Sequence, residues 1–425
     1  MFRIVPVSNS IMSDCQSSEA IAAAEGSSRI WRQVESRSGR ERGGTMDFAI
    51  SEEQRQILDT VDRLIDRHLP PEAVRQHDRE HAPPYHVLPA LGEAGLLAMP
   101  FPAENGGLAA PWESVVLVQE RLGYHAFMAA SLYNRAVGFG GMSLLVYGSE
   151  AQRERYLPEI MAGRAFFALA LTESSAGSDA ASIVTRARRR GNGWTITGRK
   201  TWISDAAAAA AMVVACRTGS PDSGADGISM FLVPPGTTGV QMTPLDKVGN
   251  NCLPCFDIGF DEVDVPGDAL MGEENHGFRH LMATLHYARA GMAASVTGAA
   301  QAAVDIALSH AGERQQFGRP IGGFQVIQHR LVDMQMRVDQ ARLLAWQLGW
   351  LIGEGRPCRR EAAQAKIVAT ETLQFVTDHG MQILASAGYA AESDMQRLWR
   401  DARLYSFGEG SNEIQRNIIA KELGL

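Results

Sequence analysis

The pattern of hydrophobic and polar positions changes twice along the chain. From residue 51 to about 165, apolar residues recur at helical spacing between breaker clusters such as LPPEA, HAPPY and PAENGG. From about 166 to 270 the pattern becomes alternating and β-branched, in runs such as WTITGRKTWIS, AMVVACR, GISMFLV and FDIGFDEVDV. We therefore expect a mostly helical first part followed by a compact β module.

After Gly277 the helical spacing returns in long stretches, at approximately 278–313, 324–354, 359–386 and 394–421. The second stretch has a narrow apolar seam with steps of four and three, at Ile327, Leu331, Met334, Val338, Ala341, Ala345 and Leu348. Such a seam is typical of helices that pack nearly antiparallel in a bundle. The sequence thus predicts a multidomain α and β protein with a helical domain (46–165), a β-barrel or β-sandwich domain (166–276) and a four-helix bundle (277–425).

The first 45 residues do not follow this pattern. They are rich in Ser, Gly, Glu and Arg and show no sustained period, which predicts a disordered extension. Ser51 can cap the helix that follows, because Gln54 falls in its first turn. The folded part is expected to begin at Met46.

Composition excludes several classes of protein. The net charge of -8 provides no basic stripe for a nucleic acid, and the one dense basic cluster, RARRR, abuts the turn GNG and fits a hairpin tip. The most apolar run, residues 206–216, is shorter than the roughly 20 residues of a membrane span. The five scattered cysteines, of which only Cys252 and Cys255 have CxxC spacing, favour a reducing, cytoplasmic location and no metal site.

Motifs of several familiar enzyme classes are absent from the sequence. There is no GxGxxG after a strand, no GxxxxGK[ST], no HExxH and no GxSxG. Nicotinamide binding on a Rossmann fold, P-loop hydrolysis and the zincin and serine-hydrolase chemistries therefore lose their usual anchors.

The stretch FGEGSNEIQR, residues 407–416, holds a glutamate, Glu409, between two glycines. Ser411 and Asn412 can cap a new helix after it. A carboxylate held at such a break beside the apolar Phe407 would be partly dry and more basic, as a catalytic base requires. Taken alone, the spacing favours a surface glutamate at a helical kink.

Five blocks, in this order, resemble the acyl-CoA dehydrogenase family. They are ALTESSAGSDAAS ending at residue 182, KTWISDA at 200–206, ERQQFGRPIGGFQ at 313–325, QILASAGY at 382–389 and RDARLYSFGEGSNEIQR at 400–416. The resemblance spans residues 46–425 and implies an FAD-dependent enzyme with this same order of helical domain, β domain and bundle.

The resemblance implies two groups of cofactor contacts. Against the flavin ring it places Leu171, Thr172, Trp202, Ile203 and Ser204, with the Ser204 hydroxyl at flavin N5. It places Ser178 near a phosphate and the bound thioester. The FAD of a neighbouring subunit would contact Arg314, Phe317, Gln325 and Gln382, and Ser411 and Asn412 would complete the cofactor site. A homotetramer or homodimer is expected, and Arg314 has the planar fork suited to a pyrophosphate.

The implied chemistry is dehydrogenation of an acyl-CoA thioester. Glu409 would remove the α-proton, the backbone N–H of Gly410 and a ribityl hydroxyl of FAD would stabilise the carbonyl oxygen, and the β-hydride would pass to flavin N5. The product would be a trans-2-enoyl thioester. An electron-transferring flavoprotein or an equivalent acceptor would reoxidise the flavin.

Position-by-position comparison leaves two alternatives open. Some family members carry the base just before the arginine of LHYAR, but this chain has Ala288 there, and Arg289 is expected to order the site. His286 stands where CoA-specific members carry an aspartate near the pantetheine, which leaves room for a carrier-protein-bound acyl group.

A flavin monooxygenase of the same fold is disfavoured because such relatives tend to lose the glutamate. A non-enzymatic scaffold would not need these motifs together.

The acyl group is only weakly indicated. In this family the depth of the acyl pocket depends on side chains of the helices around residues 127–147. The bulky Phe127, Tyr133 and Phe139 in this range suggest a short or branched chain.

Overall fold

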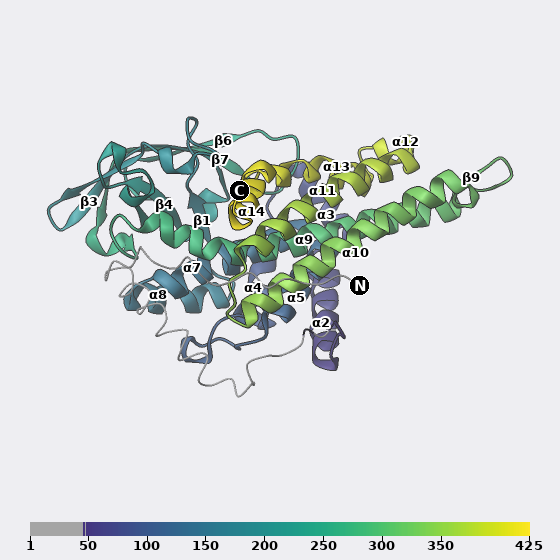
Figure 1. Cartoon of the computed structure of the whole chain (residues 1–425), viewed down its shortest axis with the longest axis horizontal. Helices are drawn as coiled ribbons and strands as arrows, with labels where there is room; N and C mark the ends of the chain where they lie inside the picture. Colours follow the sequence, from purple (N-terminus) through teal and green to yellow (C-terminus); the bar gives the residue numbers. More distant parts are fainter. Residues whose placement is uncertain (1–45, 47) are drawn as a thin grey trace, which may run out of the picture. The chain divides into compact units, whose positions relative to one another are not determined.

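The computed structural model describes Met46 and residues 48–425, so the predicted disordered extension of residues 1–45 lies outside the described residues. The N-terminal part of this region is helical (Figure 1). Ser51 caps its first helix through a capping box with Gln54, as predicted. The main helices here are α2 (Glu52–His68), α3 (Pro71–Glu80), α4 (Val87–Glu93), α5 (Trp112–His125), α6 (Phe127–Asn134), α7 (Met142–Tyr147) and α8 (Glu150–Met161).

The middle part forms one hydrogen-bonded, eight-stranded sheet. Its strands are β1 (Phe167–Ala170), β2 (Arg186–Arg190), β3 (Gly193–Ser204), β4 (Ala211–Arg217), β5 (Ile228–Val233), β6 (Val240–Leu245), β7 (Cys255–Pro266) and β8 (Leu270–Met271). Their order is β6-β7-β3-β2-β4-β5-β8, and β1 pairs with β4. Arg190 faces Gly193 across the β2–β3 turn, so the basic cluster RARRR is a strand that ends at a hairpin tip, as predicted.

The C-terminal part is a helical bundle, which confirms the predicted fold class. It contains α9 (Gly277–Glu313), a short hairpin of β9 (Gln315–Gln316) and β10 (Arg319–Pro320), α10 (Gln325–Gly353), α11 (Arg359–Leu384), α12 (Ser386–Tyr389), α13 (Asp394–Ala402) and α14 (Asn412–Glu422). Six of the seven predicted seam residues of α10 are buried and the seventh, Ile327, is half-buried. Helix α9 packs against α5, α10 and α11 and forms the centre of the bundle (Figure 1).

Helix α9 is unusually apolar. By length and composition it is the one helix of the described region that could cross a bilayer. Most of its apolar stretch is buried inside the protein. The central place of α9 in the bundle accounts for this composition, because a helix that is apolar all round is usually covered by its neighbours.

The predicted helical stretch 394–421 is interrupted in the structure. Helix α13 ends at Ala402, a 3₁₀ turn follows at Leu404–Ser406, and α14 begins only at Asn412. Glu409 (φ 56°) and Gly410 (φ 85°) both adopt left-handed backbone conformations, which break the helix. The Ser411 side chain then caps α14 by accepting a hydrogen bond from the backbone N–H of Ile414, as expected for this residue.

Close helix contacts bring the N-terminal part onto α9. Gly298 of α9 lies against the backbone of α5 at Glu120, where a Cβ atom would collide with it. Gly138 packs in the same way against Ala288, and the Asn134 side chain donates a 3.0 Å hydrogen bond to the Ala288 carbonyl. Because these contacts fix α6 and the π-helical turn after it, they place that turn beside the middle of α9.

Candidate active site

Glu409 carries a carboxylate that is withdrawn from solvent. The residue as a whole is partly exposed, but its Oε2 atom is buried and has no hydrogen-bond partner among the described residues. Burial raises the pKa of this carboxyl group to about 7, although the positive charges of Lys366, Arg289 and Arg135 act to lower it. A group with this pKa exchanges a proton readily near neutral pH.

The sequence suggested that Phe407 keeps Glu409 away from water, but the structure does not place Phe407 in that role. Phe407 is 55% exposed and points away from the core. The buried Tyr405 is the aromatic residue of this segment that packs inward: its ring contacts Phe127 edge-on at 4.8 Å, and its hydroxyl donates a 2.7 Å hydrogen bond to the Asn250 side chain. The direction of a side chain at a helix break could not be read from spacing.

Cationic groups from three separate elements act on the Glu409 carboxylate. Arg289 comes from α9, Lys366 from α11, and Arg135 from the π-helical turn Arg135–Gly141. Arg289 is only 6% exposed, and its buried Nε has no hydrogen-bond partner in the described part of the chain. A buried guanidinium normally uses its donors, so this group is suited to hold an acceptor oxygen beside Glu409.

Gly410 has the backbone conformation that the site requires. Its φ of 85° is one that L side chains rarely adopt, and a Cβ atom there would lie 2.9 Å from Gln415 Nε2. Gln415 donates a 3.0 Å hydrogen bond to the Gly410 carbonyl and so fixes the peptide. The Gly410 N–H makes no hydrogen bond within the described residues and remains a free donor next to Glu409.

Trp202 is turned outward by an irregularity in β3. The pairing of β3 with β7 shifts register between Lys200 and Ile203, and Trp202 has a φ of 59°. Such bulges re-aim side chains and are frequent near active sites. The indole is 56% exposed, whereas the neighbouring Ile203 side chain is buried in the core and leaves only its backbone available to a ligand.

A buried ion pair holds the segment of Leu171 and Thr172 against the same strand. Lys200 donates hydrogen bonds to the Leu171 carbonyl (2.9 Å) and to Glu173 Oε1 (2.8 Å). The Thr172 carbonyl accepts a 2.9 Å hydrogen bond from the backbone N–H of Thr201. The Leu171–Thr172 segment is therefore held against the part of β3 that carries Trp202.

The other predicted cofactor residues lie elsewhere. Arg314, Phe317, Gln325 and Gln382 are all exposed, and the first three lie at the far end of α9 and α10, around β9 (Figure 1). Arg314 lies about 37 Å from Arg289 along α9, by the rise per residue of a helix. Within one subunit, Arg314 is thus far from Arg289, which lies on the same helix and acts on Glu409.

The remaining predicted residues differ in accessibility. Ser178 is exposed, and His286 is partly exposed one helical turn before Arg289. Burial lowers the pKa of His286 to about 4, so its ring is neutral at physiological pH. Asn412 is buried, and its side chain bonds to Lys366 and Thr370 rather than facing outward. Its side chain is therefore part of the internal packing.

The three bulky residues expected at the acyl pocket occupy different environments. Tyr133 is fully buried and its hydroxyl donates a 2.9 Å hydrogen bond to the Leu96 carbonyl, so it belongs to the core. Phe127 lies against Tyr405, in the segment of Glu409. Phe139 lines a separate small cavity. Of the three, Phe127 is the one whose ring contacts the segment of Glu409.

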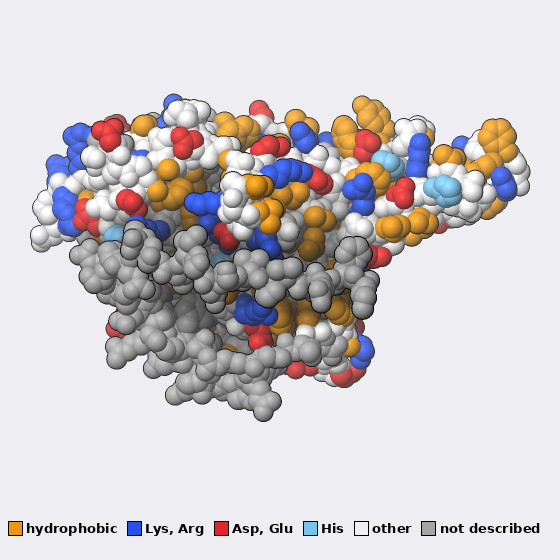
Figure 2. Space-filling model, viewed as in Figure 1, with side chains coloured by type: hydrophobic (Ala, Val, Ile, Leu, Met, Phe, Trp, Pro, Cys, Tyr) orange, Lys and Arg blue, Asp and Glu red, His pale blue; other side chains and the backbone are white. Residues whose placement is uncertain are grey.

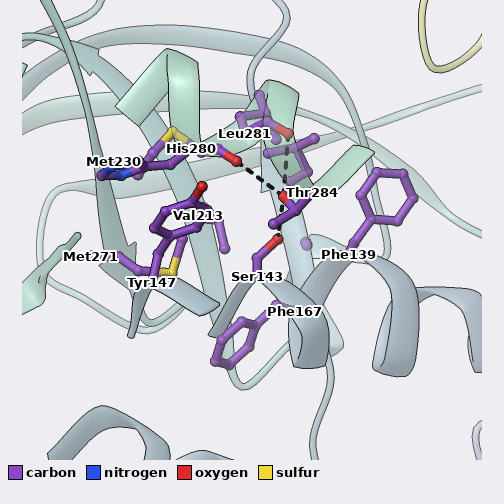
Figure 3. Close-up of a pocket in the computed structure, with 12 residues that line it drawn as sticks. Phe139, Ser143, Tyr147, Phe167, Val213, Met230, Met271, His280, Leu281 and Thr284 are labelled. Carbon is purple, nitrogen blue, oxygen red and sulfur yellow. Dashed lines mark hydrogen bonds between the residues drawn. The ribbon is translucent and has the colours of Figure 1, made fainter. Parts of the chain in front are cut away.

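That cavity, of about 10 Å³, lies between α7, the sheet and the first turns of α9 (Figure 3). It is mainly apolar, with Tyr147 stacked on His280 at 4.0 Å and a 3.0 Å hydrogen bond between Ser143 and Thr284. A space of this size holds at most one water molecule. None of the residues expected to be catalytic or to bind the cofactor lines it.

Sequence reasoning missed Arg135, Lys366, Lys200 and Glu173. Lys366 had a signal, because it stands on the face of α11 where the helical period places the buried Ala362, Ala369 and Leu373. A lone lysine at such a position requires a polar partner. Arg135 had none, since its role depends on a π-helical turn and on tertiary contacts.

Comparison with known proteins identifies the family to which the chain belongs. Residues 51–164, 168–263 and 275–424 match the N-terminal, middle and C-terminal domain models of acyl-CoA dehydrogenases. The chain belongs to the acyl-CoA dehydrogenase family, a family of FAD-binding oxidoreductases.

Individual relatives lie at moderate distance. A probable acyl-CoA dehydrogenase of Bacillus subtilis strain 168, YngJ, is 36% identical over 380 residues, covering 89% of this chain and all of the relative. A glutaryl-coenzyme A dehydrogenase in complex with glutaryl-CoA has a TM-score of 0.86 at 32% identity, covering 89% of this chain and 97% of that one. The prolyl acyl carrier protein oxidase AnaB has a TM-score of 0.85 at 26% identity, covering 89% and 100%.

Proposed function

We propose that the protein catalyses the FAD-dependent α,β-dehydrogenation of an acyl-CoA thioester to the trans-2-enoyl-CoA. The observation that carries this proposal is the buried Glu409 carboxylate, whose pKa is raised to about 7, next to the free backbone N–H of Gly410. A base and an oxyanion donor on consecutive residues are what removal of a proton α to a carbonyl requires.

The steps assigned to this chain concern the proton and the carbonyl. Glu409 takes the α-proton. The electron pair of the broken α C–H bond forms the new C=C bond as hydride leaves the β-carbon. The Gly410 N–H donates to the thioester oxygen, on which negative charge develops. Arg289 adds positive charge nearby without competing as a proton donor, since a guanidinium stays protonated. FAD, when bound, supplies the acceptor for the β-hydride.

The residues around Trp202 fit a flavin. The exposed indole offers a flat surface, the Ser204 hydroxyl stands two residues further along β3, and the Leu171–Thr172 segment is fixed beside it by Lys200. Aromatic stacking and hydrogen bonds to a polar ring edge are the contacts such a ring accepts. These residues would hold the isoalloxazine, and Ser178 would lie toward the phosphates.

The distant cofactor residues support a homo-oligomer. Arg314 can contribute to an FAD site only as part of another subunit, given its separation from Arg289 along α9. Exposed apolar side chains gather at this end of the bundle (Figure 2), among them Phe317, Val326, Val332 and Met336. A second copy of the chain would cover them. Our proposal is therefore a homodimer or homotetramer that shares its cofactor sites.

A carrier-protein-bound acyl group is the second candidate substrate. His286 supports it, because a neutral ring stands at the position where CoA-specific family members carry an aspartate near the pantetheine. The similarity to a prolyl acyl carrier protein oxidase points the same way. Reoxidation by an electron-transferring flavoprotein or an equivalent acceptor, and a cytoplasmic location, complete the proposal.

An anaerobic titration tests the proposed dehydrogenation and distinguishes the two candidate substrates. The flavin absorbance of the purified protein is followed while straight, branched and aromatic acyl-CoA thioesters are added. Bleaching by one subset supports the dehydrogenase and identifies its acyl class. If the flavin stays oxidised with every CoA ester but is bleached by the same acyl groups on a carrier protein, the second candidate replaces the first. If no thioester bleaches it, both are wrong.

A further inference from the structure

Lys366 is a buried lysine on the inner face of α11. Its exposed fraction is 0%, and its buried neighbours three or four positions away on α11 include Ala362, Ala363 and Ala369. Burying an ammonium group is costly unless hydrogen bonds compensate for its lost hydration. The partners of this group therefore indicate what the lysine does.

Those partners flank Glu409 on both sides. The Lys366 ammonium donates to the Ser406 carbonyl at 3.3 Å and to Asn412 Oδ1 at 2.8 Å. The Asn412 amide donates in turn to Thr370 Oγ1 at 3.1 Å, one turn further along α11. The segment from Ser406 to Asn412, which carries Glu409 in its left-handed conformation, is thus tied to α11 at its two ends.

We propose that Lys366 is a positioning residue, whose ammonium group clamps the ends of the Ser406–Asn412 segment and supplies a positive charge that favours the ionised form of Glu409. This inference rests on the proposed function for its catalytic meaning. The clamp and the charge are properties of the protein itself, and they can be measured without turnover.

The charges around Lys366 and Glu409 determine whether loss of the lysine raises or lowers the pKa of Glu409. Lys366 faces Glu409, Glu413 of α14, Glu371 of its own helix and, with the same sign, Arg289 of α9. Glu409 faces Lys366, Arg289 and Arg135. Burial lowers the pKa of Lys366 to about 8, so the lysine is mostly charged where Glu409 titrates. Removing this charge must raise the pKa of Glu409.

Three substitutions separate the charge from the clamp. Lys366→Met removes both, Lys366→Gln keeps a hydrogen-bond donor without charge, and Lys366→Arg keeps the charge. Thr377→Val is the matched control, because Thr377 is also buried on α11 but bonds only within that helix, to Leu373 and Gln374. It reports the effect of a general loss of stability in the helix.

The holoprotein is labelled with carboxyl-¹³C glutamate, and Glu409 is assigned as the signal missing in Glu409→Gln. We expect the Glu409 titration to move up by about one pH unit or more in Lys366→Met and Lys366→Gln. It should stay near the wild-type value in Lys366→Arg and Thr377→Val. Amide hydrogen exchange of residues 404–412 should accelerate at least about tenfold in Lys366→Met alone, as expected when a local restraint is lost.

A folded Lys366→Met or Lys366→Gln variant with the wild-type Glu409 titration overturns the charge part of the proposal. Wild-type exchange of residues 404–412 in folded Lys366→Met overturns the clamp. If Lys366→Met does not fold, Lys366→Gln still tests the charge, and Asn412→Ala, which removes the Oδ1 acceptor of Lys366, tests the clamp: residues 404–412 should exchange faster in it, and wild-type exchange would overturn the clamp. A wild-type flavin that no thioester reduces would refute the proposed function and leave these results unaffected.

Discussion

Arg135 Nε lies 3.0 Å from Asp205 Oδ2, and this pair joins the helical part of the protein to the strand that carries Trp202. Asp205 follows β3 directly and is fully buried, and the Tyr85 hydroxyl donates a 2.8 Å hydrogen bond to its other oxygen. Arg135 is also one of the cations that act on Glu409. The pair therefore links the expected flavin face to the expected base.

Asp205→Ala should destabilise the protein strongly. Removing one partner of a buried ion pair leaves the other charge unpaired, at a cost of about 3–5 kcal/mol in the free energy of unfolding. Glu159→Ala, which breaks the exposed Arg164–Glu159 pair, should cost much less, because solvent screens an exposed ion pair. Urea unfolding of both variants measures the difference. Equal losses would mean that the Arg135–Asp205 pair is no more important than a surface contact.

The rate of flavin reduction should depend on pH through Glu409. Because the base must be ionised and its pKa is raised to about 7, the rate should rise as the pH increases through about 7 and level off above. Rapid mixing with a reducing thioester on both sides of this pH gives the profile. A rate that falls over the same range would exclude Glu409 as the base.

Glu409→Gln should remove this reduction altogether while the protein remains folded and yellow, because an amide cannot accept the α-proton. Loss of a general base costs at least about 100-fold in rate. Glu413→Gln is the matched control, since Glu413 is a fully exposed carboxylate four residues away. Substantial turnover by Glu409→Gln, or an equal loss in the control, would contradict the assignment.

Gly410→Ala should impair reduction of the flavin more than it impairs stability. An alanine is strained at a φ of 85°, and its Cβ would press on Gln415, which fixes the Gly410 peptide, so the N–H donor would be displaced. Loss of one oxyanion donor costs about 100-fold or more in the chemical step. Gly312→Ala, in a helical position with open space around it, should be neutral or stabilising. Comparable reduction rates in the two variants would argue against the donor role.

Most of the fold could be predicted from the sequence because the patterns that specify strands and helices are local. Alternation in WTITGRKTWIS and the four-three seam of α10 depend only on neighbouring residues, and the structure has a strand and a buried seam at these places. The short β1, β6 and β8 were missed, since β1 has only four residues, β8 has two, and none of the six positions of β6 is fully buried. Their pairing is decided by the sheet around them.

The site could be predicted only in part, because local sequence signals do not show which distant elements meet. Motif resemblance found Glu409, Gly410 and Trp202, whose backbone conformations are unusual and need particular neighbours in sequence. It did not find Arg135 or Lys366, which reach Glu409 from distant elements. A pKa depends on burial and on charges in space, so neither the value for Glu409 nor its causes could be derived from spacing.

Arg314→Ala should weaken FAD retention although it lies far from Glu409. If subunits share cofactor sites, the exposed Arg314 guanidinium of one subunit pairs with the pyrophosphate held by another, and its loss removes a charge-assisted contact worth about 1.5–3 kcal/mol, or roughly 10- to 100-fold in flavin affinity. Arg360→Ala, at an exposed arginine of α11 paired with Glu361, is the control and should leave the affinity unchanged. Flavin dissociation is measured by fluorescence together with the mass of the assembly in solution. A monomer that retains FAD with wild-type affinity in Arg314→Ala would show that each subunit builds its cofactor site alone.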